Sequence, residues 1–118
     1  MSAGSPERPR DPQALERLLI ERQWKGDVDG MAALYEADAV LDDGSGTLTV
    51  GRAAIRQLFA TFGATGKKFA AGTQSPAVVS GDLALTSTRL PDGSITAEVA
   101  RRQSDGTWAW VIDRYSVS

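Results

Sequence analysis

The chain has 118 residues, 42% of them hydrophobic, and its thirteen Lys and Arg against fifteen Asp and Glu give a formal net charge of −2. This length fits one domain, and the balanced charge lacks the basic stripe with which nucleic-acid-binding proteins neutralise phosphates. The absence of cysteine and histidine excludes disulfides, thiolate metal ligands and a cysteine nucleophile, and it removes the commonest general base and metal ligand. We therefore expect no metal, no cofactor and no nucleic-acid partner, so any acid–base chemistry falls to carboxylates, Tyr, Lys or Arg.

Composition also predicts where the domain begins and where the protein acts. Residues 1–10 combine Ser, Gly, Pro and charged residues without periodic apolar positions, so we expect a disordered tail followed by a single domain over residues 11–118. The start of the chain lacks the apolar stretch of a secretory signal, and no run of about 18 apolar residues could span a membrane. These features favour a cytoplasmic protein with no membrane partner.

The spacing of apolar residues predicts three helices in the first half of the chain, over about residues 12–24, 27–35 and 52–62. Asp11 is a typical N-cap for the first helix, and Gly26 can end it in a left-handed turn. The third helix follows a Gly-Arg pair and stops at a glycine. Helical spacing therefore dominates the N-terminal half.

Extended segments account for the rest of the chain. A short strand at residues 39–41 and a return at 47–50 flank an Asp-Asp-Gly-Ser-Gly turn, and two later Asp-Gly pairs are strong hairpin signals. Helices followed by consecutive hairpins predict the α+β class, with three N-terminal helices packed on a strongly curved, mostly antiparallel sheet. The strands after the third helix are expected at about residues 68–74, 77–80, 83–90, 94–103 and 107–117.

Four segments, in this order along the chain, carry a resemblance to a known superfamily. They read WKGDVDGMAALY at 24–35, YEADAVLDD at 35–43, VGRAAIRQLF at 50–59 and RRQSDGTW at 101–108. The ordered set resembles the nuclear-transport-factor-2-like (NTF2-like) superfamily, especially its polyketide-cyclase-like (SnoaL-like) and ketosteroid-isomerase-like branches. The resemblance implies a cone-shaped, cystatin-like α+β barrel with a hydrophobic pocket inside, and a homodimer.

The resemblance also implies candidate catalytic residues. In the isomerase branch a carboxylate just after the first strand moves a proton, and Asp43 stands at that position. Spacing back from the last Asp-Gly turn places Glu98 where the isomerases have a second, neutral acid. Leu19 stands where they have a Tyr, so this chain departs from the isomerase pattern, and Leu19 becomes a candidate for substrate contact. From the residues alone, Asp43 could equally be a solvated turn residue, and Glu98 could pair with an arginine on a neighbouring strand.

The last predicted strand adds substrate-binding candidates. Its alternation places Asp113 and Tyr115 on one face together with Val111, which the resemblance makes the pocket face. Asp113 could instead pair with an arginine. Trp24 and Phe59 are further candidates for substrate contact, although aromatic residues more often belong to a core or an interface.

Together these residues lead to one hypothesis and one alternative. The hypothesis is a small pocket enzyme of isomerase, cyclase or epoxide-hydrolase type that uses carboxylate acid–base catalysis on an apolar, carbonyl- or epoxide-bearing metabolite. The alternative is a non-catalytic module of the same fold that binds a small ligand or forms a dimer.

Overall fold

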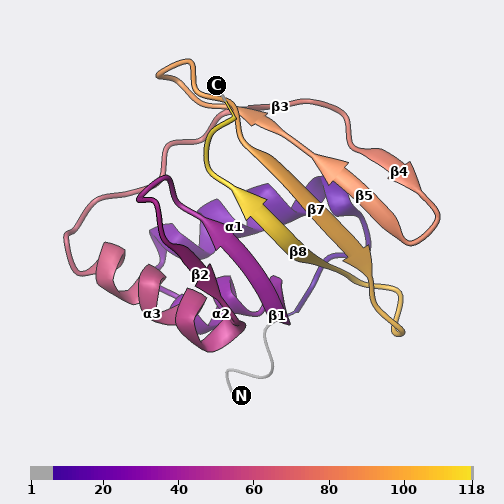
Figure 1. Ribbon diagram of the computed structural model, residues 1–118, viewed down its shortest axis with the longest axis horizontal. Helices are drawn as coiled ribbons and strands as arrows, with labels where there is room; N and C mark the ends of the chain where they lie inside the picture. The colour runs from indigo at the N-terminus through magenta and orange to yellow at the C-terminus, as the bar shows by residue number, and fades with distance from the viewer. Residues whose placement is uncertain (1–6, 118) are drawn as a thin grey trace.

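The computed structural model describes residues 7–117, and their N-terminal part forms a helical layer against a sheet (Figure 1). A 3-10 turn, Pro12–Ala14, runs directly into helix α1, Leu15–Trp24. The Asp11 carboxylate caps this unit by accepting a hydrogen bond of 2.9 Å from the backbone N of Gln13. The first predicted helix is therefore confirmed, with its predicted cap.

The second helix is shorter than predicted, because Tyr35 begins a strand. Helix α2, Val28–Ala32, starts just after Gly26, whose φ of +72° lies in the left-handed region that glycine tolerates. The carbonyl O of Leu34 then accepts a hydrogen bond of 2.7 Å from the backbone N of Trp110, and Tyr35 pairs with Trp110 in parallel register. Pairing with a distant strand overrides the helical spacing, so the prediction of a helix up to Tyr35 was wrong.

The main sheet has six strands in the order β2-β1-β8-β7-β5-β4, in which β1 and β8 are parallel and the other neighbours antiparallel. A second, two-stranded sheet pairs β3 with β6. Together with the helices, these sheets confirm the predicted α+β class. The strands are β1 (Tyr35–Asp42), β2 (Leu48–Val50), β3 (Thr73–Gln74), β4 (Val78–Ser80), β5 (Leu83–Thr86), β6 (Thr88–Arg89), β7 (Ala97–Arg102) and β8 (Trp108–Arg114).

Two predicted strands differ from the observed ones. The strand expected at 68–74 is reduced to β3, and the one expected at 83–90 is divided into β5 and β6, because the chain leaves the main sheet to pair with β3. The approach at this corner is close. A Cβ added to Gly72 would lie only 2.4 Å from the carbonyl O of Arg89, so a residue larger than glycine cannot fit here without a shift.

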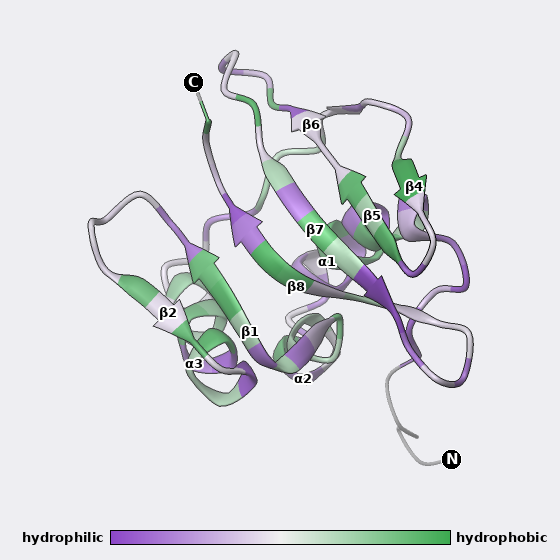
Figure 2. Ribbon diagram, turned by 45° about the vertical axis from the view of Figure 1, so that its right-hand side comes forward, coloured by the Kyte–Doolittle hydropathy of each residue, from purple (hydrophilic) through white to green (hydrophobic). Residues whose placement is uncertain are grey.

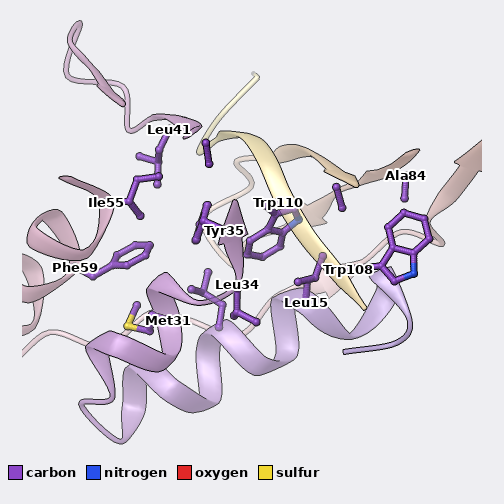
Figure 3. Packing of buried hydrophobic residues seen from close by; sticks show 13 residues of the cluster. Leu15, Met31, Leu34, Tyr35, Leu41, Ile55, Phe59, Ala84, Trp108 and Trp110 are labelled. Carbon is purple, nitrogen blue, oxygen red and sulfur yellow. The ribbon is translucent and has the colours of Figure 1, made fainter. Parts of the chain in front are cut away.

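Helix α3, Arg52–Gly63, follows the β1–β2 hairpin as predicted and packs its apolar side on β1. Figure 3 shows Tyr35 between Phe59 and Trp110, at ring-centroid distances of 5.8 Å and 5.3 Å. These rings join the helical layer to the middle of the sheet. The largest fully buried members of this core include Leu15, Met31, Leu34, Tyr35, Leu41, Ile55 and Trp110.

A β-bulge at Val111 changes which residues of β8 face the core. Ala100 of β7 lies opposite Trp110, but the next residue back, Val99, lies opposite Ile112, so Val111 has no partner of its own on β7. The extra residue shifts the alternation, and both Trp110 and Asp113 are buried although they are three positions apart. Bulges often redirect side chains next to functional sites.

The two faces of the sheet carry different side chains. On the inner face, Thr86, Glu98, Asp113 and Leu41 lie side by side across β5, β7, β8 and β1. On the outer face, one register position away, every strand of the main sheet contributes an apolar residue, and green bands cross these strands in Figure 2. We call this set the outer apolar row; it consists of Val78, Leu85, Val99, Ile112, Val40 and Val50.

The segment before α1 lies against the domain. The carbonyl O of Pro9 accepts a hydrogen bond of 2.8 Å from the backbone N of Trp108, and the Arg8 Nε donates one of 2.8 Å to the carbonyl O of Ala33. From residue 7 onward, the segment expected to be a disordered tail is thus held by the fold, while residues 1–6 lie outside the described residues. No helix within residues 7–117 is long and apolar enough to cross a membrane.

Candidate functional site

A small cavity of about 130 Å³ lies between helix α1, the segment around Phe69 and the inner face of the sheet. Its walls combine apolar side chains with several carboxyl groups. A pocket with an apolar lining and few convergent polar groups is the usual form of a small-molecule site. The lining residues are Glu16, Leu19, Ile20, Phe69, Ala70, Leu90, Thr96, Glu98, Asp113 and Tyr115.

Glu98 and Asp113 form the polar wall of this cavity. They lie directly opposite each other on β7 and β8, and they are only 2% and 3% exposed. The arginine pairing considered for Glu98 is absent, since its neighbours across the sheet are Thr86 and Asp113. Two buried carboxyl groups side by side cannot both ionise cheaply, because each charge is desolvated and repels the other.

Hydrogen bonds hold Glu98 in place. The Thr86 hydroxyl donates to Glu98 Oε1 at 2.6 Å, and the Trp110 indole Nε1 donates to the Thr86 Oγ1 at 3.2 Å. Burial raises the pKa of Glu98 above its ordinary value, while hydrogen bonds from Thr86 and Thr96 act in the opposite direction. The carboxyl of Glu98 therefore has a fixed orientation and an increased tendency to hold a proton.

Asp113 is held from the other side by Tyr35. The Tyr35 hydroxyl donates to Asp113 Oδ2 at 2.5 Å. Burial raises the pKa of Asp113 well above its ordinary value, the charge of Glu98 adds to this, and the hydrogen bond from Tyr35 opposes it. Burial likewise raises the pKa of Tyr35 well above its ordinary value, so this hydroxyl stays a donor. Sequence reasoning missed Tyr35 because it placed the residue on a helix.

Glu16 brings a third carboxyl group to the cavity from helix α1. Burial, together with the charge of Glu98, raises the pKa of Glu16 to about 7. Sequence reasoning also missed this residue, because a glutamate beside an apolar helical stripe resembles a surface residue. One signal was present: Glu16, Leu19 and Ile20 have the i, i+3, i+4 spacing of a single helix face, and all three line the cavity.

Several predicted site residues do line the cavity. Glu98 and Asp113 form its polar wall, Leu19 lines it from α1, and Tyr115 lines it just after β8. Burial raises the pKa of Tyr115, and the charge of Asp113 raises it further, so its hydroxyl is a neutral group beside the carboxyls. The structure therefore brings together four of the predicted residues from three elements of the fold.

Asp43 is not among the residues that line the cavity, so its expected role as the proton-moving group stays a prediction without support from this cavity. Its Oδ1 accepts a hydrogen bond of 2.9 Å from the backbone N of Ser45, the arrangement of an Asx turn. Hydrogen bonds with Ser45 lower the pKa of Asp43 below its ordinary value. Of the two interpretations of Asp43, the geometry matches the turn residue.

Trp24 and Phe59 are not among the residues that line the cavity either, so their contact with substrate stays a prediction without support from this cavity. The Trp24 side chain is 56% exposed, and its Nε1 donates a hydrogen bond of 2.8 Å to the carbonyl O of Phe69. Phe59 is buried in the core between the rings of Tyr35 and Phe69. One aromatic is therefore a surface residue and the other a core residue.

The donor set of the cavity suits proton transfer. Within residues 7–117, no group of three His, Cys, Asp or Glu residues is arranged to hold a metal ion. A protonated carboxyl can donate a hydrogen bond to a substrate oxygen, and a carboxylate with a pKa near 7 can accept a proton at neutral pH. Both kinds of group are present around one apolar space.

Comparisons with known proteins identify the fold. No curated protein matches the chain. Similar solved structures include an NTF2-like protein with a cystatin-like fold from Novosphingobium aromaticivorans, at 21% identity and a TM-score of 0.67, covering 88% of this chain and 77% of that one. A proposed dehydratase of the NTF2-like family from Streptomyces avermitilis has 15% identity and a TM-score of 0.69, with coverages of 88% and 93%. A ketosteroid isomerase-like protein from Erwinia carotovora atroseptica has 17% identity and a TM-score of 0.67, with coverages of 89% and 92%.

At these identities the structures show that the chain shares the NTF2-like, cystatin-like fold. The sequence comparison is more specific, because the profile of the SnoaL-like domain matches residues 16–118 and so covers all of the cavity-lining residues. The chain belongs to the SnoaL-like domain family.

Proposed function

We propose that the protein is a pocket enzyme that uses its own carboxyl groups as acid and base on a small apolar molecule bearing a carbonyl or an epoxide. One observation carries this proposal: three carboxyl groups with raised pKa values, those of Glu16, Glu98 and Asp113, line one apolar cavity. Burying carboxyl groups is costly for stability, and perturbed acids in a cavity are typical of functional sites. We expect the enzyme to act in the cytoplasm.

In this proposal the three carboxyl groups have different roles. Glu16, with a pKa of about 7, is the general base and takes a proton from a carbon next to the substrate carbonyl. Asp113 stays protonated and donates a hydrogen bond to the carbonyl oxygen through the carboxyl oxygen that Tyr35 does not occupy. Glu98 supports both roles, because its negative potential raises the pKa of Glu16 and of Asp113.

Returning the proton to a different carbon completes an isomerisation, so no other reactant is required. With an epoxide, Asp113 would protonate the ring oxygen while Glu16 activates a water molecule. The cavity volume of about 130 Å³ limits the part of the substrate that enters it. A cavity of about 150 Å³ holds one benzene molecule, so we expect a reacting part about as large as a single six-membered ring.

The experiment is a screen of small cyclic enones and epoxides, followed by variants of the cavity. Glu16→Gln and Asp113→Asn should each lower kcat on a turned-over compound by about 100-fold or more, because each removes one partner of the proton transfer. Glu21→Gln is the matched control: Glu21 lies on the same helix, is exposed and pairs with Arg17 at 2.6 Å. Unchanged turnover in Glu16→Gln would refute the mechanism.

We also propose that two copies of the chain associate through the outer apolar row. Val78 and Ile112 in this row are 65% and 50% exposed, and the row crosses the whole main sheet. Burying apolar area is the main source of association energy, and a two-fold dimer brings the same patch of both copies together. A dimer is compatible with the pocket enzyme. If the screen finds no turnover, a dimer would support the alternative, a non-catalytic dimerisation module.

A further inference from the structure

A second hollow, of about 1040 Å³, lies on another part of the surface. The segment before α1, the link from α2 to β1, the first turn of α3 and the β7–β8 turn enclose it, and none of its lining residues belongs to the carboxyl cavity. We call it the arginine groove. Four arginines line it, namely Arg8, Arg10, Arg52 and Arg56, and alanines contribute much of the remaining surface.

Hydrogen bonds to backbone carbonyls fix two of these guanidinium groups. Arg8 Nε donates to the carbonyl O of Ala33 at 2.8 Å, and Arg52 Nε donates to the carbonyl O of Tyr35 at 2.9 Å. These two acceptors are only two residues apart, so both side chains converge on the same link between α2 and β1. Each bond uses Nε, so within residues 7–117 no hydrogen bond occupies the terminal nitrogens of Arg8 and Arg52, whose paired N–H groups match a phosphate or a carboxylate.

Three carboxylates line the groove with the four arginines, namely Glu7, Asp29 and Asp105. Asp29 pairs with Arg56 at 2.5 Å. The Asp105 carboxylate accepts hydrogen bonds from the backbone N and the hydroxyl of Thr107 at 2.9 Å and 2.6 Å. Across residues 7–117, neither Arg8 nor Arg52 forms an ion pair with a carboxylate. Four arginines against three carboxylates leave one excess positive charge in the groove, although the net charge of the chain is −2.

The N-terminus of helix α3 provides an independent reason to expect an anion. Its N-cap is Gly51, which has no side chain to accept a hydrogen bond, and its first turn contains no acidic residue. The helix has twelve residues, and both Arg52 and Ala53 from its first turn line the groove. Free backbone N–H groups and the helix dipole at such an end favour phosphate groups.

We propose that the arginine groove binds a small organic phosphate ester. Its phosphate lies between Arg8, Arg52 and the N-terminus of α3, and its organic part lies on the surface formed by Ala32, Ala33, Ala37 and Ala53. The volume of the groove is at the upper end of the range for small-ligand sites, about 300–1,000 Å³, so it holds more than an inorganic ion. This site is independent of the reaction proposed for the carboxyl cavity.

The test is an NMR titration of the backbone amides with phenyl phosphate, inorganic phosphate and benzoate. Phenyl phosphate should shift the amides of residues 52–54 and of the link at residues 33–35, and it should bind more tightly than either other probe. Raising the salt concentration from about 50 mM to about 300 mM should weaken this binding, because screening reduces charge attraction. Absence of shifts at low salt, or equal binding of the three probes, would overturn the proposal.

Variants locate the site. Arg52→Gln should weaken phenyl phosphate binding about tenfold, because a bidentate charged contact is lost. Arg17→Gln is the control, since Arg17 lies on α1, forms an exposed ion pair with Glu21 and does not line the groove. Arg8→Gln covers the case in which Arg52→Gln fails to fold, because Arg8 carries the other guanidinium group placed at the phosphate and lies before α1. The assignment is contradicted if Arg52→Gln, or Arg8→Gln where Arg52→Gln is unfolded, binds phenyl phosphate as tightly as Arg17→Gln does.

Discussion

Glu98 and Asp113 face each other across β7 and β8 on the buried side of the sheet, where Thr86 holds one carboxyl and Tyr35 holds the other. The bulge at Val111 makes this possible, because it directs Asp113 to the same side as Trp110. A pair of buried acids lowers stability unless it is hydrogen-bonded. Thr86 and Tyr35 each donate a hydrogen bond to one oxygen of these carboxyl groups. Both carboxyl groups lie on the wall of the cavity.

The raised pKa of Glu16 predicts how stability depends on pH. A carboxyl whose pKa is higher in the folded state than in the unfolded state binds its proton more tightly when folded. Its contribution to stability is therefore complete below its ordinary pKa of 4.5 and is lost as the pH rises through about 7. The free energy of unfolding in urea should fall between about pH 5 and about pH 8, by at most about 3 kcal/mol for this group.

Glu16→Gln is the variant that checks this assignment, because it removes the titrating group and keeps the shape of the side chain. Its unfolding free energy should fall less over the same pH interval, with the remaining fall due to Glu98 and Asp113, whose pKa values are also raised, while Glu21→Gln should follow the parent protein. A parent protein whose stability is flat or rises across this interval would show that the pKa of Glu16 is not raised.

Tyr35→Phe should destabilise the fold by removing the hydrogen bond to Asp113. The buried carboxyl then loses a donor, which costs about 1–3 kcal/mol at neutral pH and raises the pKa of Asp113 further. Tyr115→Phe is the matched control, because no hydrogen bond joins the Tyr115 hydroxyl to another described residue. Urea unfolding near neutral pH measures both variants, and equal losses of stability would contradict a special role for Tyr35.

Turnover should depend on pH through two groups. Activity rises with pH as Glu16 loses its proton near pH 7, and it falls again when Asp113 loses its proton. Glu16→Asp should keep the rising limb at lower activity, because the carboxylate is retained but withdrawn by one methylene. The measurement is kcat/KM against pH for a compound found in the screen, and a pH-independent rate would argue against carboxylate catalysis.

The outer apolar row predicts a dimer that a single charge can dissociate. Ile112→Lys places an ammonium group in the middle of the row, and burying it without a partner costs several kcal/mol. Val79→Lys is the control. Val79 is also about half exposed, but it lies one register position away from the outer apolar row and pairs with Ala84. Sedimentation equilibrium should give a monomer for Ile112→Lys and a dimer for Val79→Lys. A monomeric parent protein would refute the interface.

Local signals in the sequence predict much of this fold. Asp11 and Gly26 mark the limits of the first helix, and the apolar spacing and a preceding glycine mark the third. These features act over a few residues, so they can be identified without knowing the tertiary structure. The superfamily resemblance also located Glu98 beside the cavity.

Long-range contacts determine the features of the fold and of the site that local sequence signals do not predict. Tyr35 enters a strand because Trp110, far along the chain, pairs with it, and the bulge at Val111 has no local signal in an alternating strand. Glu16 becomes a cavity residue only because α1 covers the buried carboxyl pair. Asp43 is the reverse case, because a local interaction, the Asx turn with the backbone N of Ser45, fixes its position. The missed residues are those that distant segments bring together.

Carboxyl groups with raised pKa values line one apolar cavity, and a carboxyl-carbon NMR titration of the free protein measures these pKa values group by group. We expect a midpoint near pH 7 for Glu16, midpoints above the ordinary range for Glu98 and Asp113, and one below it for Asp43. If Glu16, Glu98 and Asp113 all titrate near 4, as solvated carboxyl groups do, the cavity holds no acid–base pair and the enzyme proposal fails.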